Sequence, residues 1–164
     1  MPATKRGQDM SKFVVGQVLE HDHRLIDADF QRFKEGLERD EWLSEPFQRA
    51  ADALRHHIYV EEEGLFPVLR VGGLVAPVFV MLAEHAEIWR SLDAIEAEVG
   101  RDAGRALAAM ARMVSVLDSH NSKEEQILYP ASAQVLNPDD TEAVRLAFEQ
   151  GKRPEGWVPT NLRG

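Results

Sequence analysis

The sequence of 164 residues contains no cysteine and has few aromatic residues, at 7% of the chain. The absence of cysteine excludes a disulfide framework, a thiolate zinc site, an iron–sulfur cluster and a cysteine nucleophile. Basic residues are also scarce, with 19 Lys and Arg against 28 Asp and Glu, a formal net charge of −9. The longest basic clusters are pairs such as Lys5-Arg6 and Lys152-Arg153. Because such a chain repels phosphate backbones, we expect no nucleic-acid partner.

Long apolar runs are missing as well. No stretch of 18 apolar residues occurs, and the first ten residues have no apolar run behind their two basic side chains. We therefore expect neither a membrane span nor a signal peptide, and we expect the protein to be cytoplasmic and to have no membrane partner. With 44% apolar and 29% charged residues, the chain can bury one full core, and its length favours a single domain.

No segment shows a strand pattern, whereas apolar residues recur at helical spacing between prolines and glycines. We predict an all-α fold, an up-down-up-down four-helix bundle with a short fifth helix and an extended C-terminal tail. Ser11 is the expected first cap, and Pro67 is expected to end or kink the second helix. The predicted parts are a flexible N-terminus 1–10, the bundle 11–136, and a short helix and tail 137–164 that Trp157 docks on the surface. The predicted helices are 11–40, 44–67, 76–100, 102–130 with a kinked continuation toward 136, and 141–150.

Each of the four long helices has an apolar stripe suited to a bundle core, and a histidine interrupts every stripe. In two helices a glutamate follows the histidine one turn later. The stripes are Leu19, His23, Ile26, Phe30, Phe33 and Leu37 in the first helix; Phe47, Ala50, Leu54, His57, Glu61, Leu65 and Val68 in the second; Val78, Met81, His85, Ile88, Leu92, Ile95 and Val99 in the third; and Ala106, Met110, Met113, Leu117, His120, Glu124, Ile127 and Ala131 in the fourth.

The two halves of the chain repeat this pattern. The block from His57 to Pro67 matches the block that begins at His120, 63 positions later, through His, Glu, Leu, an aromatic residue and Pro. The pair Asp22-His23 matches Glu84-His85 at a shift of 62. With a helical rise of about 1.5 Å per residue, all four histidines are expected to share one layer of the bundle.

Six polar side chains in an apolar layer need a chemical explanation. A single inward histidine is usually a hydrogen-bonded core residue, but two buried carboxylates facing each other without a cation would be costly. Imidazole and carboxylate donors suit iron, zinc or copper, and a solvent-derived bridge would leave about one open position per metal ion. We therefore predict a site for two divalent metals, with terminal ligands His23, His57, His85 and His120 and bridging ligands Glu61 and Glu124.

These residues give the chain a family resemblance over about residues 11–136. It resembles the haemerythrin-like, or HHE cation-binding, family, which implies a four-helix bundle holding two Fe ions in a non-haem centre, usually oxo- or hydroxo-bridged. The family binds dioxygen or handles related small molecules. The matching segments are Glu20-His21-Asp22-His23-Arg24, His57-Ile58-Tyr59-Val60-Glu61-Glu62-Glu63-Gly64-Leu65-Phe66-Pro67, Glu84-His85, and His120-Asn121-Ser122-Lys123-Glu124-Glu125-Gln126-Ile127-Leu128-Tyr129-Pro130.

Two positions depart from the oxygen-carrying haemerythrins. Those proteins have a second histidine one turn after the third-helix ligand, where this chain has Trp89, which we expect to wall the site. They also use an aspartate five residues after the fourth-helix histidine, whereas this chain has Glu124 at four and Glu125 at five. The chain therefore resembles the four-His, two-Glu branch of the family. Some members of that branch repair or donate iron through a cysteine-bearing N-terminal module, whereas this sequence contains no cysteine, so we do not expect that role.

Other polar residues near the stripes have weaker assignments. His21 and His56 are expected to point off the core face, and Tyr59 also projects away from it. Glu62 and Glu125 either orient a ligand imidazole or stay solvated.

Four functions remain open at this point. The first is a protein that binds O2 or NO for sensing, buffering or storage. The second is an enzyme that decomposes peroxide or reduces NO. The third is an iron-holding or repair protein, which the lack of cysteine disfavours, and the fourth is a structural bundle held by a metal such as zinc. The expected partner is a small diatomic or peroxide ligand, and the sequence identifies no redox partner.

Overall fold

The computed structural model describes residues 13–164, so the predicted flexible segment 1–10 and the predicted cap Ser11 lie outside the described residues. All regular elements in this range are helical, which confirms the all-α prediction. The long helices are α2 (Val15–Glu38), α3 (Ser44–Val60), α5 (Val75–Glu98) and α6 (Ala103–Lys123). The shorter elements are η2 (Glu61–Leu65), α4 (Phe66–Val71), η3 (Glu124–Leu128), α7 (Tyr129–Val135), α8 (Pro138–Glu149) and η4 (Thr160–Leu162).

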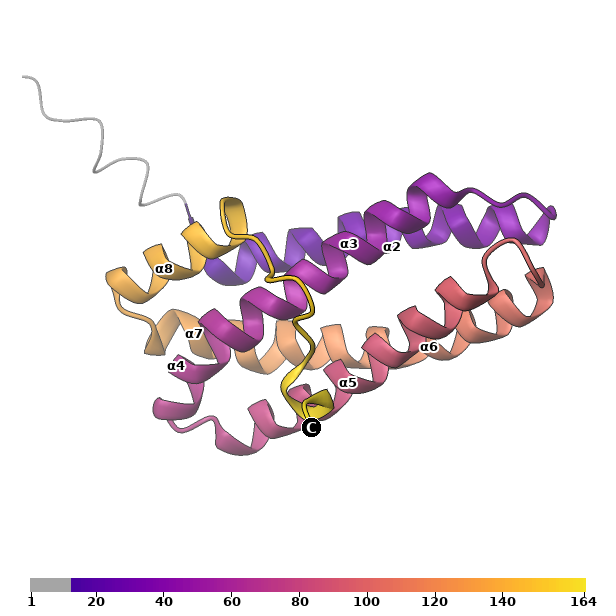
Figure 1. Ribbon diagram of the computed structural model, residues 1–164. Helices are drawn as coiled ribbons and strands as arrows, with labels where there is room; N and C mark the ends of the chain where they lie inside the picture. Colours follow the sequence, from indigo (N-terminus) through magenta and orange to yellow (C-terminus); the bar gives the residue numbers. More distant parts are fainter. Residues whose placement is uncertain (1–12) are drawn as a thin grey trace, which may run out of the picture.

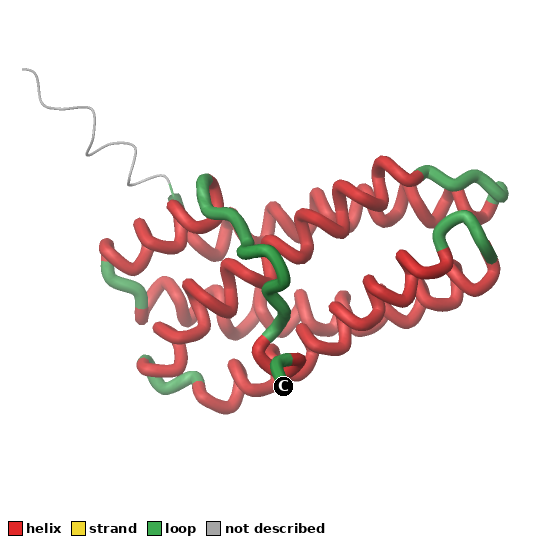
Figure 2. Tube along the Cα trace, viewed as in Figure 1, coloured by secondary structure: helices red, strands yellow, loops and turns green. Residues whose placement is uncertain are grey.

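The long helices form the predicted up-down-up-down bundle (Figure 1). Helix α2 packs along α3, α5 packs along α6, and the two hairpins meet mainly through α2 and α6, while α3 and α5 touch little. The short helix α8 packs against α3, and the chain then runs back over α3 to place η4 on α5 (Figure 2). No helix within residues 13–164 has the length and apolar character needed to cross a bilayer.

Helix ends depart from the predictions by a few residues. Helix α2 begins at Val15 and has no side-chain cap. Asp102 caps α6 as predicted, its carboxylate accepting the backbone N–H of the third residue of the helix. Asn137 and Asp140 cap α8 reciprocally, so this helix begins at Pro138 instead of 141. A proline is favourable there, because N–H groups in the first turn have no helical partner.

The second helix does not end at Pro67 but continues to Val71, so the predicted end is wrong. The chain passes through η2, a π-helical turn in which the N–H of Phe66 bonds to the carbonyl of Glu61, five residues earlier. In a regular α-helix the Pro67 ring would clash with the carbonyl four residues before it, and the wider turn relieves that clash. The π-helical turn η3 repeats this arrangement before Pro130, and the helix then continues as α7.

Each π-helical turn adds one residue to the helix, so the buried face moves by one position beyond it. Leu65 is buried as predicted, but the rest of the stripe after the two glutamates is wrong: Val68 and Ala131 are only half-buried, and Ile127 is 49% exposed. The buried residues are instead Leu69, Leu128 and Ser132.

A polar layer divides the apolar core into two clusters. The larger core lies toward the α2–α3 and α5–α6 loops, and the smaller core lies among α4, α7, α8 and the adjoining ends of α2 and α5. On every long helix the core changes from one cluster to the other near the predicted histidine. The larger core includes Ile26, Phe30, Phe33, Phe47, Leu54, Ile88, Leu92, Ile95, Met110, Met113 and Leu117, and the smaller core includes Val15, Leu19, Leu65, Phe66, Leu69, Val78, Met81, Leu128 and Val144.

Candidate metal centre

The structure brings all six predicted ligands together in the layer between the two cores. His23 comes from α2, His85 from α5, and each of the other two histidines precedes a glutamate by one helical turn. That spacing places both members of a His/Glu pair on one helix face. All six side chains are almost inaccessible, with exposures of 3% or less: His23, His57, Glu61, His85, His120 and Glu124.

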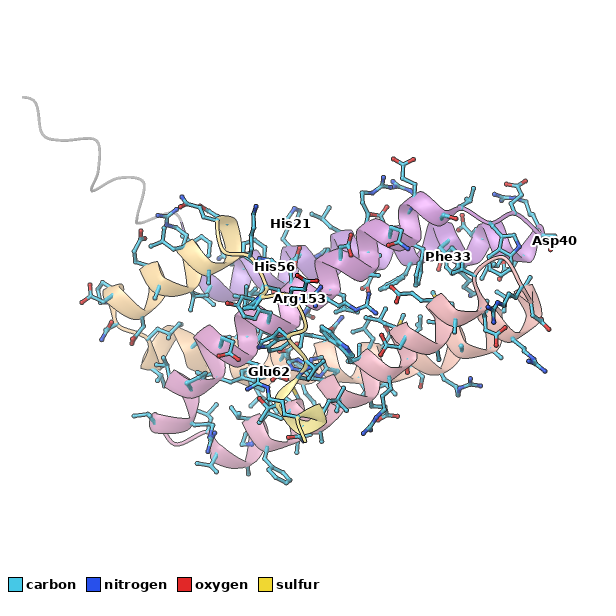
Figure 3. All side chains as sticks on the ribbon, in the orientation of Figure 1. His21, Phe33, Asp40, His56, Glu62 and Arg153 are labelled. Atoms are coloured by element: carbon cyan, nitrogen blue, oxygen red, sulfur yellow. The ribbon has the colours of Figure 1, made fainter. Side chains whose placement is uncertain are left out.

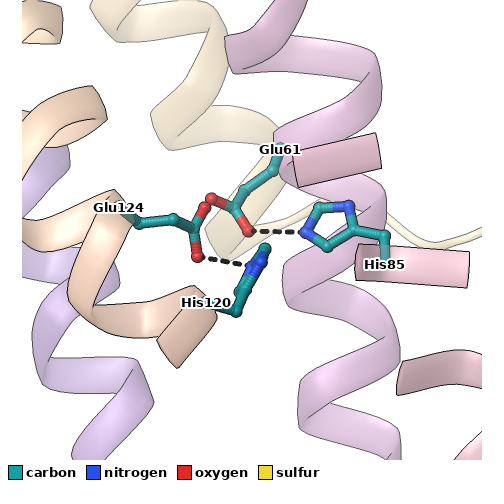
Figure 4. A group of neighbouring side chains, drawn as sticks. All are labelled: Glu61, His85, His120 and Glu124. Atoms are coloured by element: carbon teal, nitrogen blue, oxygen red, sulfur yellow. Dashed lines mark ion pairs between the residues drawn. The ribbon is translucent and has the colours of Figure 1, made fainter. Parts of the chain in front are cut away.

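Two groups of donor atoms form within this layer. In the first, Glu61, His85, His120 and Glu124 each offer one atom, and these atoms all lie within 4.8 Å of one another (Figure 4). His120 Nε2 lies 2.9 Å from Glu124 Oε1, and His85 Nε2 lies 3.5 Å from Glu61 Oε1.

The second group consists of His23, His57 and Glu124. The two Nε2 atoms of His23 and His57 are 3.1 Å apart, and His23 Nε2 lies 3.5 Å from Glu124 Oε1. His57 Nε2 lies 3.1 Å from Glu61 Oε1. Both glutamates therefore contact histidines of both groups, which is the arrangement that bridging carboxylates require.

Every one of the four imidazoles has a carboxylate on its outer nitrogen. This contact fixes the tautomer with Nδ1 protonated, so that Nε2 is the nitrogen left to bind a metal. The four Nδ1–carboxylate pairs are His57 with Asp22 at 2.7 Å, His120 with Glu84 at 3.0 Å, His85 with Glu62 at 2.9 Å, and His23 with Glu125 at 3.1 Å.

These contacts decide between the two alternatives for Glu62 and Glu125, since both orient an imidazole. The roles of Asp22 and Glu84 were missed by the sequence reasoning. The sequence did contain a sign of these roles, because an acidic residue precedes a histidine in both halves of the repeat. Each acidic side chain, however, binds the histidine of the neighbouring helix and not the histidine that follows it in sequence.

Unpartnered atoms show that the layer fits a cation. Within residues 13–164, five buried side-chain atoms have no hydrogen bond, and four of them belong to this cluster: Glu61 Oε1, His85 Nε2 and both carboxylate oxygens of Glu124. Burying polar atoms without partners is costly, and divalent cations would satisfy all four at once.

The electrostatics of the layer keep the Glu61 carboxylate ionised. Burial disfavours the charged imidazoles, but Glu61 and Asp22 outweigh it and raise the pKa of His57 well above its usual value. Burial likewise opposes the charge on His120, but Glu124 and its other carboxylate partner raise the pKa of that imidazole to about 10. Despite burial, His57 holds the pKa of Glu61 well below its usual value. In the absence of a cation, His57 and His120 balance negative charge in the layer.

Tyr129 is a further polar group in the layer that sequence reasoning took only as an aromatic of the repeat. Its hydroxyl donates to Glu61 Oε2 at 3.2 Å and lies 3.1 Å from His23 Nε2. Burial, then the nearby carboxylates, raises the pKa of Tyr129 well above its usual value, so the phenol stays protonated. Its counterpart in the repeat is Phe66, whose ring stacks on His85 at 5.4 Å. The difference between Phe66 in the first copy and Tyr129 in the second is the sequence feature that could have indicated a polar role for Tyr129.

The remaining histidines lie outside the cluster, as predicted (Figure 3). His21 is exposed on α2. His56 Nε2 lies 2.9 Å from the carbonyl oxygen of Phe148, where it links α3 to α8. Tyr59 packs edge-on against Trp157, away from the layer.

Comparison with known proteins agrees with this geometry. Residues 15–132 match the family model described as the hemerythrin HHE cation binding domain. No curated protein and no solved structure matches the chain significantly. The matched range includes all six buried histidines and glutamates of the layer, and this domain binds metal cations. The chain therefore belongs to the hemerythrin family of HHE cation-binding domains.

Proposed function

We propose that this protein binds two iron ions in the polar layer and uses them to bind O2 or NO in the cytoplasm, for sensing, buffering or storage. The observation that carries the proposal is the pair of buried donor groups that share Glu124 and are also joined through the contact of Glu61 with His57, with four atoms of the layer unpartnered. Histidine and carboxylate donors suit iron, and iron coordinated in this way supplies an exchangeable position for a small ligand.

The surrounding residues support reversible binding. Four carboxylates hold the imidazoles in the tautomer that points Nε2 inward, so little reorganisation is needed when a metal binds. The larger and smaller cores enclose the layer on both sides, and its six predicted ligands are each 3% exposed or less. A buried site of this kind favours a small neutral ligand over a charged one.

A second candidate is an enzyme that decomposes peroxide or reduces NO, and Tyr129 favours it. The phenolic hydroxyl lies within the layer, 3.1 Å from His23 Nε2, and holds its proton at neutral pH. A hydroxyl at that place can donate a hydrogen bond to a small oxygen- or nitrogen-containing substrate and stabilise negative charge that develops on it. A protein that only binds and releases a diatomic molecule does not need such a donor.

The experiment is iron analysis of anaerobically purified, reconstituted protein, followed by optical spectra on addition of O2, NO or peroxide. Two irons per chain and a stable, reversible spectrum support the binding function. Rapid oxidation with consumption of peroxide or NO supports the enzyme. Less than one iron per chain, or a preference for zinc with no spectral response, would refute both.

Variants test the ligand assignment in the same assay. Glu61→Ala and Glu124→Ala each remove a proposed bridge and should abolish the pairing of the two ions. His56→Ala is the matched control, because His56 lies outside the cluster and contacts α8. Intact dinuclear iron in the glutamate variants would contradict the assignment.

A further inference from the structure

The C-terminal segment, residues 151–164, crosses the face of the bundle between α3 and α5, and we call it the strap. It leaves the end of α8, passes in front of α3 and places η4 on α5 (Figures 1 and 2). It lies beyond the residues that match the family model, which end at 132. Since α3 and α5 touch little directly, the strap covers the face where these two neighbouring helices contact each other least, at the level of the polar layer.

The strap reaches the metal layer through one carboxylate. The backbone N–H and the hydroxyl of Thr160 both donate to Glu62 Oε2, each at 2.8 Å. The other oxygen, Glu62 Oε1, lies 2.9 Å from Nδ1 of His85. Glu62 is buried, with 7% of its surface exposed, so its position depends on these partners and not on solvent. The contacts form a continuous chain from Thr160 through Glu62 to the proposed ligand His85.

An aromatic anchor holds the strap in place. Trp157 donates from Nε1 to Glu63 Oε1 at 2.9 Å, and Arg163 donates to the same oxygen at 2.9 Å. The Trp157 ring packs edge-on against Tyr59 of α3, with centroids 5.3 Å apart, and against Trp89 of α5, at 5.7 Å. Trp157 therefore joins the two helices that otherwise barely meet.

Trp89 is also covered by cations. The Arg55 guanidinium lies 5.3 Å from the centre of its ring, and Arg153 of the strap lies 5.2 Å from it. Arg55 also pairs with Glu96 of α5 at 2.6 Å. Figure 3 labels Glu62 and Arg153, which lie where the strap crosses the α3–α5 face. Trp89 is therefore packed among side chains of α3 and the strap, and that it walls the site stays a prediction.

The opposite face of the bundle, between α2 and α6, is built differently. In the internal repeat Trp89 corresponds to Asp27, and Arg55 corresponds to Asp118. Glu125, the counterpart of Glu62, holds His23 at 3.1 Å, but its side chain is 33% exposed. A pocket of about 370 Å³ opens there, lined by Glu20, His23, Arg24, Asp27, Asp118, Asn121, Ser122 and Glu125.

We propose that the strap is part of the metal centre: Thr160 positions His85 through Glu62, and the strap closes the α3–α5 face. The metal position served by His85 and His120 then exchanges its ion slowly, whereas the position served by His23 and His57 exchanges through the open pocket beside His23. This inference rests on the proposed dinuclear site. Thr160 is a positioning residue, since it acts through Glu62 and touches no proposed ligand.

Iron release to an excess of chelator under anaerobic conditions tests the proposal. The wild type should release its two ions in a fast and a slow phase. Thr160→Val removes one of the two hydrogen bonds that Glu62 Oε2 accepts and keeps the backbone N–H bond. It should speed the slow phase by less than the roughly 10- to 100-fold effect of losing a direct partner of a ligand histidine, with the fast phase unchanged. Truncation after Gly156 should have a larger effect on the same phase. Thr160→Ser should restore slow release, and Thr141→Val on α8 is the matched control.

A second measurement does not depend on metal. In NMR spectra of the metal-free protein, the Nδ1–H proton of His85 should be protected from exchange with water in the wild type and should exchange faster in Thr160→Val. The Nδ1–H of His23, held by Glu125, should exchange at the same rate in both.

The outcomes separate the strap from the dinuclear site on which it rests. A wild type that holds no iron would refute the proposed function, and the NMR measurement would then decide on the contact chain from Thr160 to His85 by itself. Unchanged release and unchanged His85 protection in Thr160→Val would overturn the strap proposal. Equal acceleration of both phases would also overturn it, because that is the result of general loosening of the fold.

Discussion

The hydroxyl of Tyr129 offers the sharpest test of how the polar layer is balanced. Tyr129→Phe removes one oxygen and leaves the ring in the smaller core. The hydroxyl donates to the ionised carboxylate of Glu61, and a hydrogen bond to a charged group contributes roughly 1.5–3 kcal/mol. We therefore expect the free energy of unfolding of the metal-free protein to fall by about that amount. For a chain of this size, each kcal/mol lowers the unfolding temperature by roughly 2–4 °C.

The assay is urea unfolding of metal-free wild type and variant, with Tyr59→Phe as the control. The chain has two tyrosines, so this pair isolates the hydroxyl of the layer. The ring of Tyr59 packs on Trp157 away from the layer, and its variant should change stability by less than about 0.5 kcal/mol. Equal effects of the two substitutions would refute the placement of the Tyr129 hydroxyl against Glu61. Loss of peroxide or NO turnover in Tyr129→Phe alone would favour the enzymatic function.

Three further predictions address the supporting residues. Asp22→Asn removes the charge of the carboxylate that holds His57 Nδ1, and it should lower metal affinity by about 10- to 100-fold in a chelator competition. Asp29→Asn is the control and should leave metal affinity unchanged. The hydrogen bond from Arg49 lowers the pKa of Asp29 in the folded protein. This contact therefore stabilises the fold above the unfolded pKa of 3.8, and the stabilisation is lost as pH falls through the lower folded pKa. In urea unfolding, the free energy of unfolding should fall less between pH 7 and pH 3 in Asp29→Asn than in the wild type. Phe33→Ala opens a cavity in the larger core and should cost about 3–5 kcal/mol in urea unfolding without changing iron content; a lower iron content would show that the layer depends on that core.

The fold and the six clustered residues were predictable because both leave a periodic signal. An apolar stripe fixes which face of a helix is buried, and a polar residue in the stripe, such as His85, must then be buried with it. The repeat added the pairing of the two halves. That these residues bind iron remains a prediction, because donor type and spacing do not select the metal.

Other features leave no such signal. The π-helical turn before Pro67 depends on how the chain accommodates the proline ring while the flanking residues stay packed. Because this turn adds one residue, the buried position is Leu69 and not Val68. The role of Asp22 depends on how α2 and α3 cross, which spacing within one helix does not reveal. The strap has no periodicity at all, so only the docking of Trp157 was anticipated.

The division of the apolar core by the polar layer has a consequence for how the protein unfolds. Each core holds together its own end of the bundle, and the layer between them contributes little hydrophobic cohesion. Without metal, we expect the two ends to open separately, with the smaller core and its short helices opening at lower free energy. Ions bound by ligands from all four long helices would join these ends into one cooperative unit, so metal occupancy would set the cooperativity of folding as well as its stability.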